Sequence, residues 1–111
     1  MWLFTETGFV SAVVNSENRG KIVARARDKE SLDALSKLVG RPVATTPRRD
    51  YQFRVVVERE TFHNWISNSV ERLDYTNFKN RMWETRGANF SEPLHDVWAV
   101  MRRVTDPEEP G

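Results

Sequence analysis

A run of alternating residues at positions 50–57 constrains the fold of this chain more than any other stretch. One set of residues in this run is apolar and is expected to face a core: Tyr51, Phe53, Val55 and Val57. Arg54 belongs to the other set. Because successive side chains of a β-strand point to opposite faces, this period of two predicts a strand with one buried face and one face that carries a cation. We expect this strand to lie in the centre of a sheet.

Three further segments are predicted to form strands. Positions 9–14 and 21–27 are separated by a short polar turn, so the two segments should pair antiparallel. Positions 42–46 carry an early proline, which suits an edge strand. Residues Trp2–Thr5 form a short apolar piece before a turn, and we do not assign them to the sheet.

Apolar residues at helical spacing predict four helices, one between the second and third strands and three after the last strand. Their apolar stripes lie within residues 32–39, 62–73, 78–83 and 94–104. Asp28 is the expected cap of the first helix, and Gly40 is its expected terminator. Asp74 or Thr76 should cap the third helix, and Ser91 should cap the fourth.

The order of these elements predicts an α+β fold. A right-handed crossover leaves a gap that the strand at 51–57 can fill, which places the four strands antiparallel in the order 1-2-4-3. This arrangement resembles a rearranged ferredoxin-like sandwich with added C-terminal helices. We expect one domain at residues 1–104 and a disordered tail at 105–111. The central strand should pack under Leu35, Ile66 and Val70.

Composition narrows the function classes. The chain has no cysteine, which excludes disulfides, thiolate metal sites and a cysteine nucleophile. The formal charge is +1, so no basic excess of the kind seen in dedicated nucleic-acid binders is present. No apolar run approaches the roughly 18 residues of a membrane span. We therefore expect a cytoplasmic protein without a membrane partner, and no motif indicates a cofactor, a metal or a catalytic set.

Several short motifs together resemble a known group. They are Met1-Trp2-Leu3-Phe4, Val23-Ala24-Arg25-Ala26-Arg27, Asp50-Tyr51-Gln52-Phe53-Arg54-Val55, Asp74-Tyr75-Thr76-Asn77-Phe78-Lys79 and His95-Asp96-Val97-Trp98. With these motifs the chain resembles a group of short uncharacterised proteins from bacteria and their phages. The resemblance runs from Met1 to about Val104. It implies a single compact domain and brings no activity, cofactor or catalytic residue.

Arginines on two predicted neighbouring strands mark a candidate binding face. Arg25, Arg27 and Arg54 should share one face of the sheet, with Phe9 on the same side and Tyr51 on the other. Three interpretations of this face are open. Its arginines are solvated or paired with acids, or the face binds a protein, or it binds nucleic acid as an RNA-recognition sheet does. Glu58 could neutralise it. Separately, Arg48 and Arg49 form a small basic loop that is either a solvated turn or an anion site.

Aromatic residues supply the candidate interface. The interface candidates are Trp2, Phe9, Trp83 and Trp98, although Trp98 also lies on the predicted core stripe of the last helix. Trp is favoured at interfaces because it carries a large apolar surface. The helices at 78–83 and 94–104 add apolar surface beyond what one sheet layer can hide, which favours a homodimer or another protein partner.

We therefore predict a non-enzymatic protein-interaction module, in the manner of a small phage or bacterial regulator or inhibitor. The alternative is a nucleic-acid-binding protein that uses the arginine face, and a small enzyme is the second alternative. Only two histidines are present, His63 and His95, in different helices, and no acid lies at a spacing that would complete a convincing zinc set. A metal site built from Asp74, Glu84 and His95 is conceivable but not favoured. Salt-dependent binding of single-stranded nucleic acid would separate the first two hypotheses.

Overall fold

The computed structural model describes residues 1–105, which fall into two compact units. The first unit is Met1–Asp74, and the second begins at Tyr75. The single domain expected at 1–104 stays a prediction. Of the tail expected at 105–111, only Thr105 is described, and the rest lies outside the described residues. In residues 1–105 no helix has both the length and the apolar character needed to cross a membrane.

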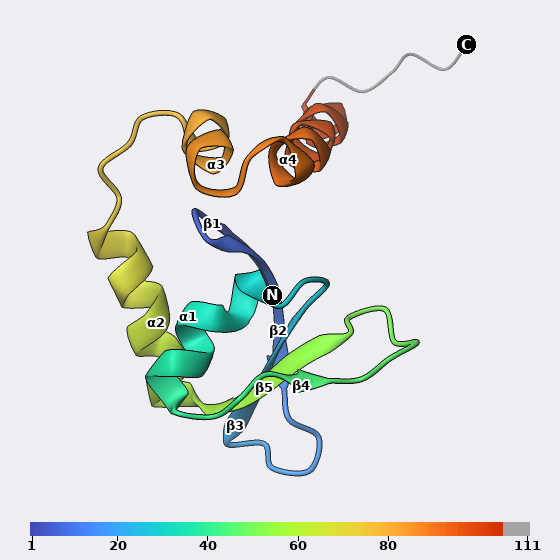
Figure 1. Ribbon diagram of the computed structural model, residues 1–111, viewed down its shortest axis with the longest axis vertical. Coiled ribbons are helices and arrows are strands. Elements are labelled where there is room, and N and C mark those ends of the chain that lie inside the picture. Colours follow the sequence, from blue (N-terminus) through green and yellow to red (C-terminus); the bar gives the residue numbers. More distant parts are fainter. Residues whose placement is uncertain (106–111) are drawn as a thin grey trace. The chain divides into compact units, whose positions relative to one another are not determined.

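The first unit is built on an antiparallel sheet (Figure 1). Its strands are β1 (Trp2–Thr5), β2 (Gly8–Val14), β3 (Lys21–Ala26), β4 (Ala44–Thr45) and β5 (Phe53–Glu58). They lie in the order β1-β2-β3-β5-β4. The α+β class is confirmed, but the sheet has five strands instead of the predicted four. The order therefore differs from 1-2-4-3 by an added edge strand, β1, while the four expected strands keep their expected neighbours.

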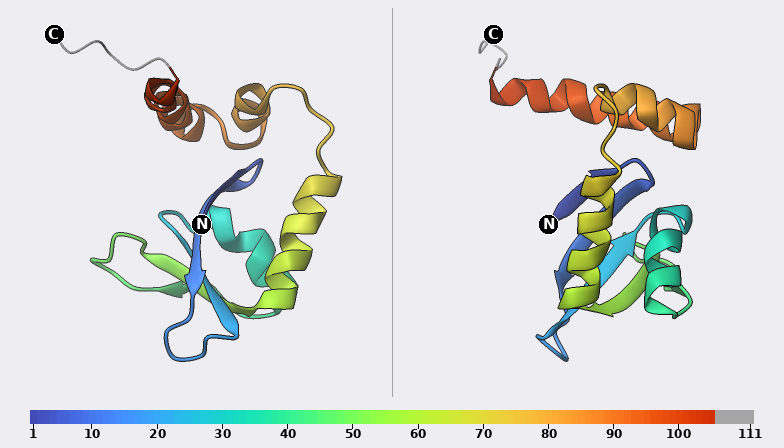
Figure 2. Two further views of the ribbon diagram at one scale, coloured as in Figure 1. Left: turned by 180° about the vertical axis from the view of Figure 1, so that it is seen from behind. Right: turned by 90° about the vertical axis from the view of Figure 1, so that its left-hand side faces the viewer.

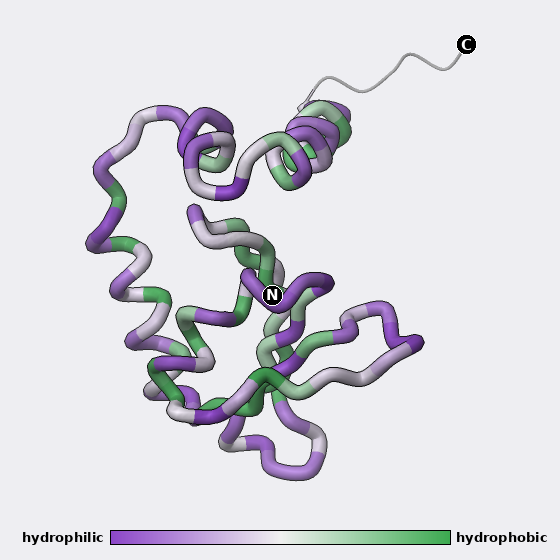
Figure 3. The backbone as a smooth tube through the Cα atoms, in the orientation of Figure 1, coloured by the Kyte–Doolittle hydropathy of each residue, from purple (hydrophilic) through white to green (hydrophobic). Residues whose placement is uncertain are grey.

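Helices α1 (Glu30–Val39) and α2 (Arg59–Glu71) cover one face of this sheet (Figure 2). The core lies between them and the sheet. Its buried members are Val10, Ala12, Ala24, Ala26, Leu32, Leu35, Val55, Val57, Phe62 and Trp65. The alanines of β3 are fully buried, and their small side chains let the helices approach the sheet closely. Figure 3 shows the hydrophobic residues gathered along these central strands.

The first turn of α1 is joined to the sheet by a serine. The helix is capped at Lys29 without a side-chain hydrogen bond, so the cap expected at Asp28 is wrong. Asp28 instead accepts a hydrogen bond from the Ser31 hydroxyl. The Ser31 oxygen in turn accepts from the Phe9 amide at 3.2 Å. The expected terminator is confirmed, because Gly40 has φ 75° and its N–H donates to the Ser36 carbonyl.

Two expectations for the central strand are wrong. The strand starts at Phe53, so the alternation does not extend back to Tyr51, whose ring lies under Arg25 and Arg27 on the face opposite the core. Val70 does not pack on the strand either, since it is 60% exposed near the end of α2. In the first case the alternating pattern begins before the strand does. In the second case the apolar stripe of α2 continues past the part of the helix that packs on the sheet.

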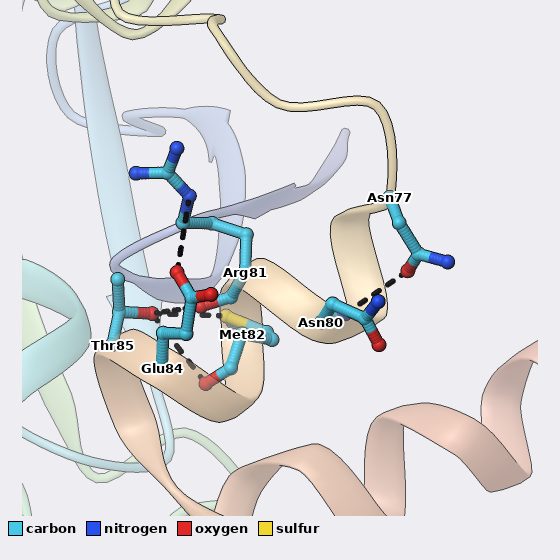
Figure 4. Close-up of polar contacts among 6 residues, drawn as sticks. All are labelled: Asn77, Asn80, Arg81, Met82, Glu84 and Thr85. Atoms are coloured by element: carbon cyan, nitrogen blue, oxygen red, sulfur yellow. Dashed lines mark hydrogen bonds and ion pairs between the residues drawn. The ribbon is translucent and has the colours of Figure 1, made fainter.

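The second unit consists of α3 (Phe78–Arg86), α4 (Ala88–Met101) and a short 3-10 turn at Arg102–Val104. The cap of α3 is Asn77, which accepts from the Asn80 amide at 3.0 Å, and not Asp74 or Thr76 (Figure 4). Along the same helix Thr85 donates to the Arg81 carbonyl at 3.1 Å. The last helix begins three residues before the cap expected at Ser91, which lies inside it.

The core predicts a difference between two leucines of α1. Leu35 is fully buried against the sheet, whereas Leu38 is 47% exposed. Leu35→Ala should lower the free energy of unfolding by about 2–5 kcal/mol, because it removes buried methyl groups and leaves a cavity. Leu38→Ala, the matched control, should cost less than about 1 kcal/mol. Urea unfolding measures both, and equal losses would contradict the described packing of α1.

Candidate functional site

The face of the sheet opposite α1 and α2 carries the most distinctive set of side chains in the first unit. We call it the arginine–aromatic face. It comprises Trp2, Phe4, Phe9, Ser11, Val13, Val23, Arg25, Arg27, Tyr51, Arg54 and Val56. No helix of Met1–Asp74 packs on it, since α1 and α2 both contribute to the core on the other side.

Strand register lines these residues up across the sheet. Trp2 lies opposite Ser11, Ser11 opposite Arg25, and Arg25 opposite Arg54. Because each strand exposes alternate residues, the same register leaves the buried alanines and valines on the core side. The register of β1, β2, β3 and β5 is therefore enough to place the arginines on the same face as the aromatic residues.

One end of the face is an aromatic cluster. The rings of Phe4 and Phe9 are stacked, with centroids 4.6 Å apart. Trp2 meets the Phe9 ring edge-on at 5.4 Å, and Tyr51 meets it at 6.4 Å. Pairs in these geometries add stability beyond the area that they bury. Trp2 is 66% exposed, so the cluster presents a large apolar side chain on the same face as the arginines.

Two arginines cover the Tyr51 ring. The guanidinium carbons of Arg25 and Arg27 lie 4.7 and 4.5 Å from its centroid, and Tyr51 is only 8% exposed. This geometry allows cation–π attraction. Arg27 also forms an ion pair with Asp50 at 2.9 Å. Burial opposes the charge of Arg27, but the hydrogen bond and charge of Asp50, with Tyr51, raise its pKa above the ordinary value.

Arg25 and Arg54 are directly opposite each other and are not neutralised. Arg25 donates to the Ser11 hydroxyl at 2.8 Å, and Arg54 to the Tyr51 carbonyl at 3.4 Å. In residues 1–105 neither forms an ion pair with an acid, and the Nε atom of each is buried without a hydrogen-bond partner. Glu58, expected as a neutralising group, pairs with Lys21 at 3.3 Å instead. Like charges opposite each other are destabilising, so this pair favours an anionic ligand.

A row of valines continues the face on the other side of the arginines. Val13 lies opposite Val23, and Val23 lies opposite Val56. Val13 is exposed, and the other two are half-buried. The solvent face of an antiparallel sheet is usually polar, so an apolar row next to an aromatic cluster is typical of a binding surface.

The structure does not bring the other basic candidates into this arrangement. Arg48 and Arg49 are exposed residues of the turn between β4 and β5. Arg48 has φ 69°, in the left-handed region that residues other than glycine seldom adopt. The contacts found in residues 1–105 give them no role beyond that turn.

The remaining aromatic candidates lie in the second unit. Trp83 and Trp98 are 57% and 46% exposed, so the core position expected for Trp98 is wrong. The His95 ring stacks on Trp98 at 5.4 Å, and the Lys79 ammonium lies 4.2 Å from the same indole. Exposed apolar residues at helical spacing follow on α4 and the turn after it: Val97, Val100, Met101 and Val104.

A shallow hollow of about 650 Å³ lies along α3 and α4. Its lining is Lys79, Asn80, Trp83, Ser91, Glu92, His95 and Asp96. In residues 1–105 no group of three or more His, Cys, Asp or Glu side chains is placed to hold a metal ion. Charges of both signs line the hollow, and nothing in its geometry selects one ligand class.

No family model, curated protein or solved structure matches this chain. Sequence reasoning found Phe9, Arg25, Arg27 and Arg54 but missed Phe4 and Tyr51. Phe4 follows from Trp2 at the period of two once residues 2–5 are assigned as a strand.

The Tyr51 cluster generates a stability prediction. Tyr51→Ala should lower the free energy of unfolding by about 2–4 kcal/mol, because it removes a buried ring and its contacts with both guanidinium groups. Tyr51→Phe keeps the ring and should cost less than about 1 kcal/mol. Urea unfolding of the two variants measures the difference. A Tyr51→Ala variant as stable as the unsubstituted chain would show that the cluster contributes nothing to folding.

Proposed function

We propose that this protein acts by binding and not by catalysis, and that its arginine–aromatic face binds an acidic segment of a partner protein. The observation that carries the proposal is the opposed pair of Arg25 and Arg54, which lacks acidic partners in the described residues and lies in the same cross-strand row as exposed Trp2. Carboxylates accept hydrogen bonds from guanidinium groups in a planar, bidentate geometry. A partner carboxylate would relieve the repulsion between the two arginines.

The composition of the face supports a protein partner. Trp, Tyr and Arg are the residues that most often dominate the binding energy of protein interfaces. The valine row beside the arginines offers apolar area to a partner side chain. The surrounding packing would hold Arg25 in place before binding, since its guanidinium group contacts the Ser11 hydroxyl and the Tyr51 ring. Such preorganisation lowers the entropy cost of association.

Single-stranded nucleic acid is the second candidate ligand. Tyr51 favours it, because this residue adds an aromatic ring to the arginine face where the sequence pattern had placed it in the core. The available ring surfaces weigh against it. Base stacking needs exposed ring faces, yet Tyr51 lies under two arginines and Phe4 stacks on Phe9. Trp2 alone among these four rings is largely exposed.

Selection from a displayed library of random peptides tests the first proposal. The selected peptides should combine Asp or Glu with a large apolar residue. Arg25→Gln/Arg54→Gln should weaken their binding by at least about tenfold, which corresponds to about 1.4 kcal/mol. The matched control is Arg41→Gln/Arg72→Gln, which removes two exposed arginines after α1 and α2 and should leave binding unchanged. Peptides without acids, or equal binding by the two double variants, would contradict the proposal.

Titration with a single-stranded oligonucleotide at several salt concentrations tests the second candidate. If the protein partner is correct, oligonucleotide binding should be weak and insensitive to Trp2→Ala. Tight binding whose logarithm falls steeply with the logarithm of salt concentration, and which Trp2→Ala weakens, would favour nucleic acid. Circular dichroism of each variant separates lost binding from lost folding.

A further inference from the structure

The outer edge of β1 presents backbone groups that the sheet does not use. Met1 and Ala12 exchange both of their backbone hydrogen bonds, at 2.8 and 3.0 Å. In an antiparallel pair, hydrogen-bonded and non-hydrogen-bonded residues alternate. Leu3 therefore bonds to β2, whereas the amide and carbonyl of Trp2 and Phe4 point away from β2. The close stacking of Phe4 on Phe9 agrees, because side chains approach most closely at non-hydrogen-bonded pairs.

Nothing on β1 blocks the addition of another strand. Edge strands are usually protected by proline, lysine, a bulge or very short length. The opposite edge strand shows such protection, because β4 has two residues and lies between Pro42 and Pro47. The sequence of β1 is Trp-Leu-Phe-Thr, with no charge and no proline. In the described residues, no hydrogen bond outside the sheet occupies the backbone of Trp2 or Phe4.

We propose that β1 pairs antiparallel with β1 of a second copy of this chain. Leu3 would lie opposite Leu3 of the second copy, at the two-fold axis. Trp2 of each copy would then exchange both backbone hydrogen bonds with Phe4 of the other copy. This register uses every outward-pointing group of the two residues, and it is self-complementary, as a two-fold interface must be.

The side chains suit this pairing. Trp2 and Phe4 lie on the arginine–aromatic face, so each Trp2 would lie directly opposite a Phe4 of the second copy. Cross-strand aromatic pairs stabilise antiparallel strands. On the other side, Leu3 packs against the core of its own unit and would meet Leu3 of the second copy. The two arginine–aromatic faces would become one continuous surface, with two arginine pairs related by the axis.

Amide hydrogen exchange, measured by NMR across a range of protein concentrations, tests the proposal directly. The Trp2 and Phe4 amides should exchange fast in dilute protein and become at least tenfold slower as the dimer forms, because pairing removes them from water. The Leu3 amide bonds to β2 in both states and serves as the internal reference. Sedimentation at the same concentrations should report the dimer.

A pair of variants at one position isolates the backbone contribution. Trp2→Pro removes an outward amide and should abolish the dimer, whereas Trp2→Ala keeps the amide and should only weaken it. Circular dichroism should show both folded. A protein that stays monomeric at high concentration would overturn the proposal. A dimer in which the Trp2 and Phe4 amides remain unprotected, or one that Trp83→Ala abolishes, would equally overturn it and place the contact on the helices. These outcomes do not depend on Arg25 or Arg54.

Discussion

The packing of α1 and α2 against one face of the sheet is the contact on which the rest of the first unit depends. It uses the small and branched side chains at alternate positions of β2, β3 and β5, such as Ala24 and Val55. Strand geometry then assigns every intervening residue to the opposite face. Arg25 and Arg54 meet there because their neighbours Ala24 and Val55 are needed in the core. The composition of the arginine–aromatic face is thus a consequence of how the core is built.

Local periodicity was enough to predict most of this unit. The strand from Phe53, the pairing of β2 with β3 and the buried Leu35 all follow from patterns within a few residues. Strand β1 escaped prediction because Trp2, Leu3 and Phe4 are all apolar and show no alternation. Tyr51 was misplaced because a pattern in sequence cannot show where hydrogen bonding to the neighbouring strand begins. The exposure of Trp98 depends on how far the packing against α4 extends, which its spacing does not reveal.

The arginine–aromatic face combines groups that stabilise the fold with charged groups that lower its stability. Tyr51 and Ser11 hold Arg25 in one orientation, and Asp50 neutralises Arg27. Arg54, by contrast, gains only a long contact with a carbonyl oxygen. An acid beside such a pair would stabilise the fold, as Glu58 does for Lys21 two rows further along the same face. The uncompensated charge of Arg25 and Arg54 is the feature of this face that core packing does not explain.

The hydrogen bond from the Phe9 amide to Ser31 has a mechanical consequence. Strand β3 ends at Ala26, so the ladder has no further backbone acceptor for Phe9, and the first turn of α1 supplies one. The helix thereby continues the sheet's hydrogen bonding by means of a side chain. The Phe9 ring packs in the aromatic cluster, and the Phe9 amide bonds to the first turn of α1. A movement of this ring is therefore linked to a movement of the helix. A ligand that displaced the aromatic cluster would therefore also displace the start of α1, on the opposite side of the sheet.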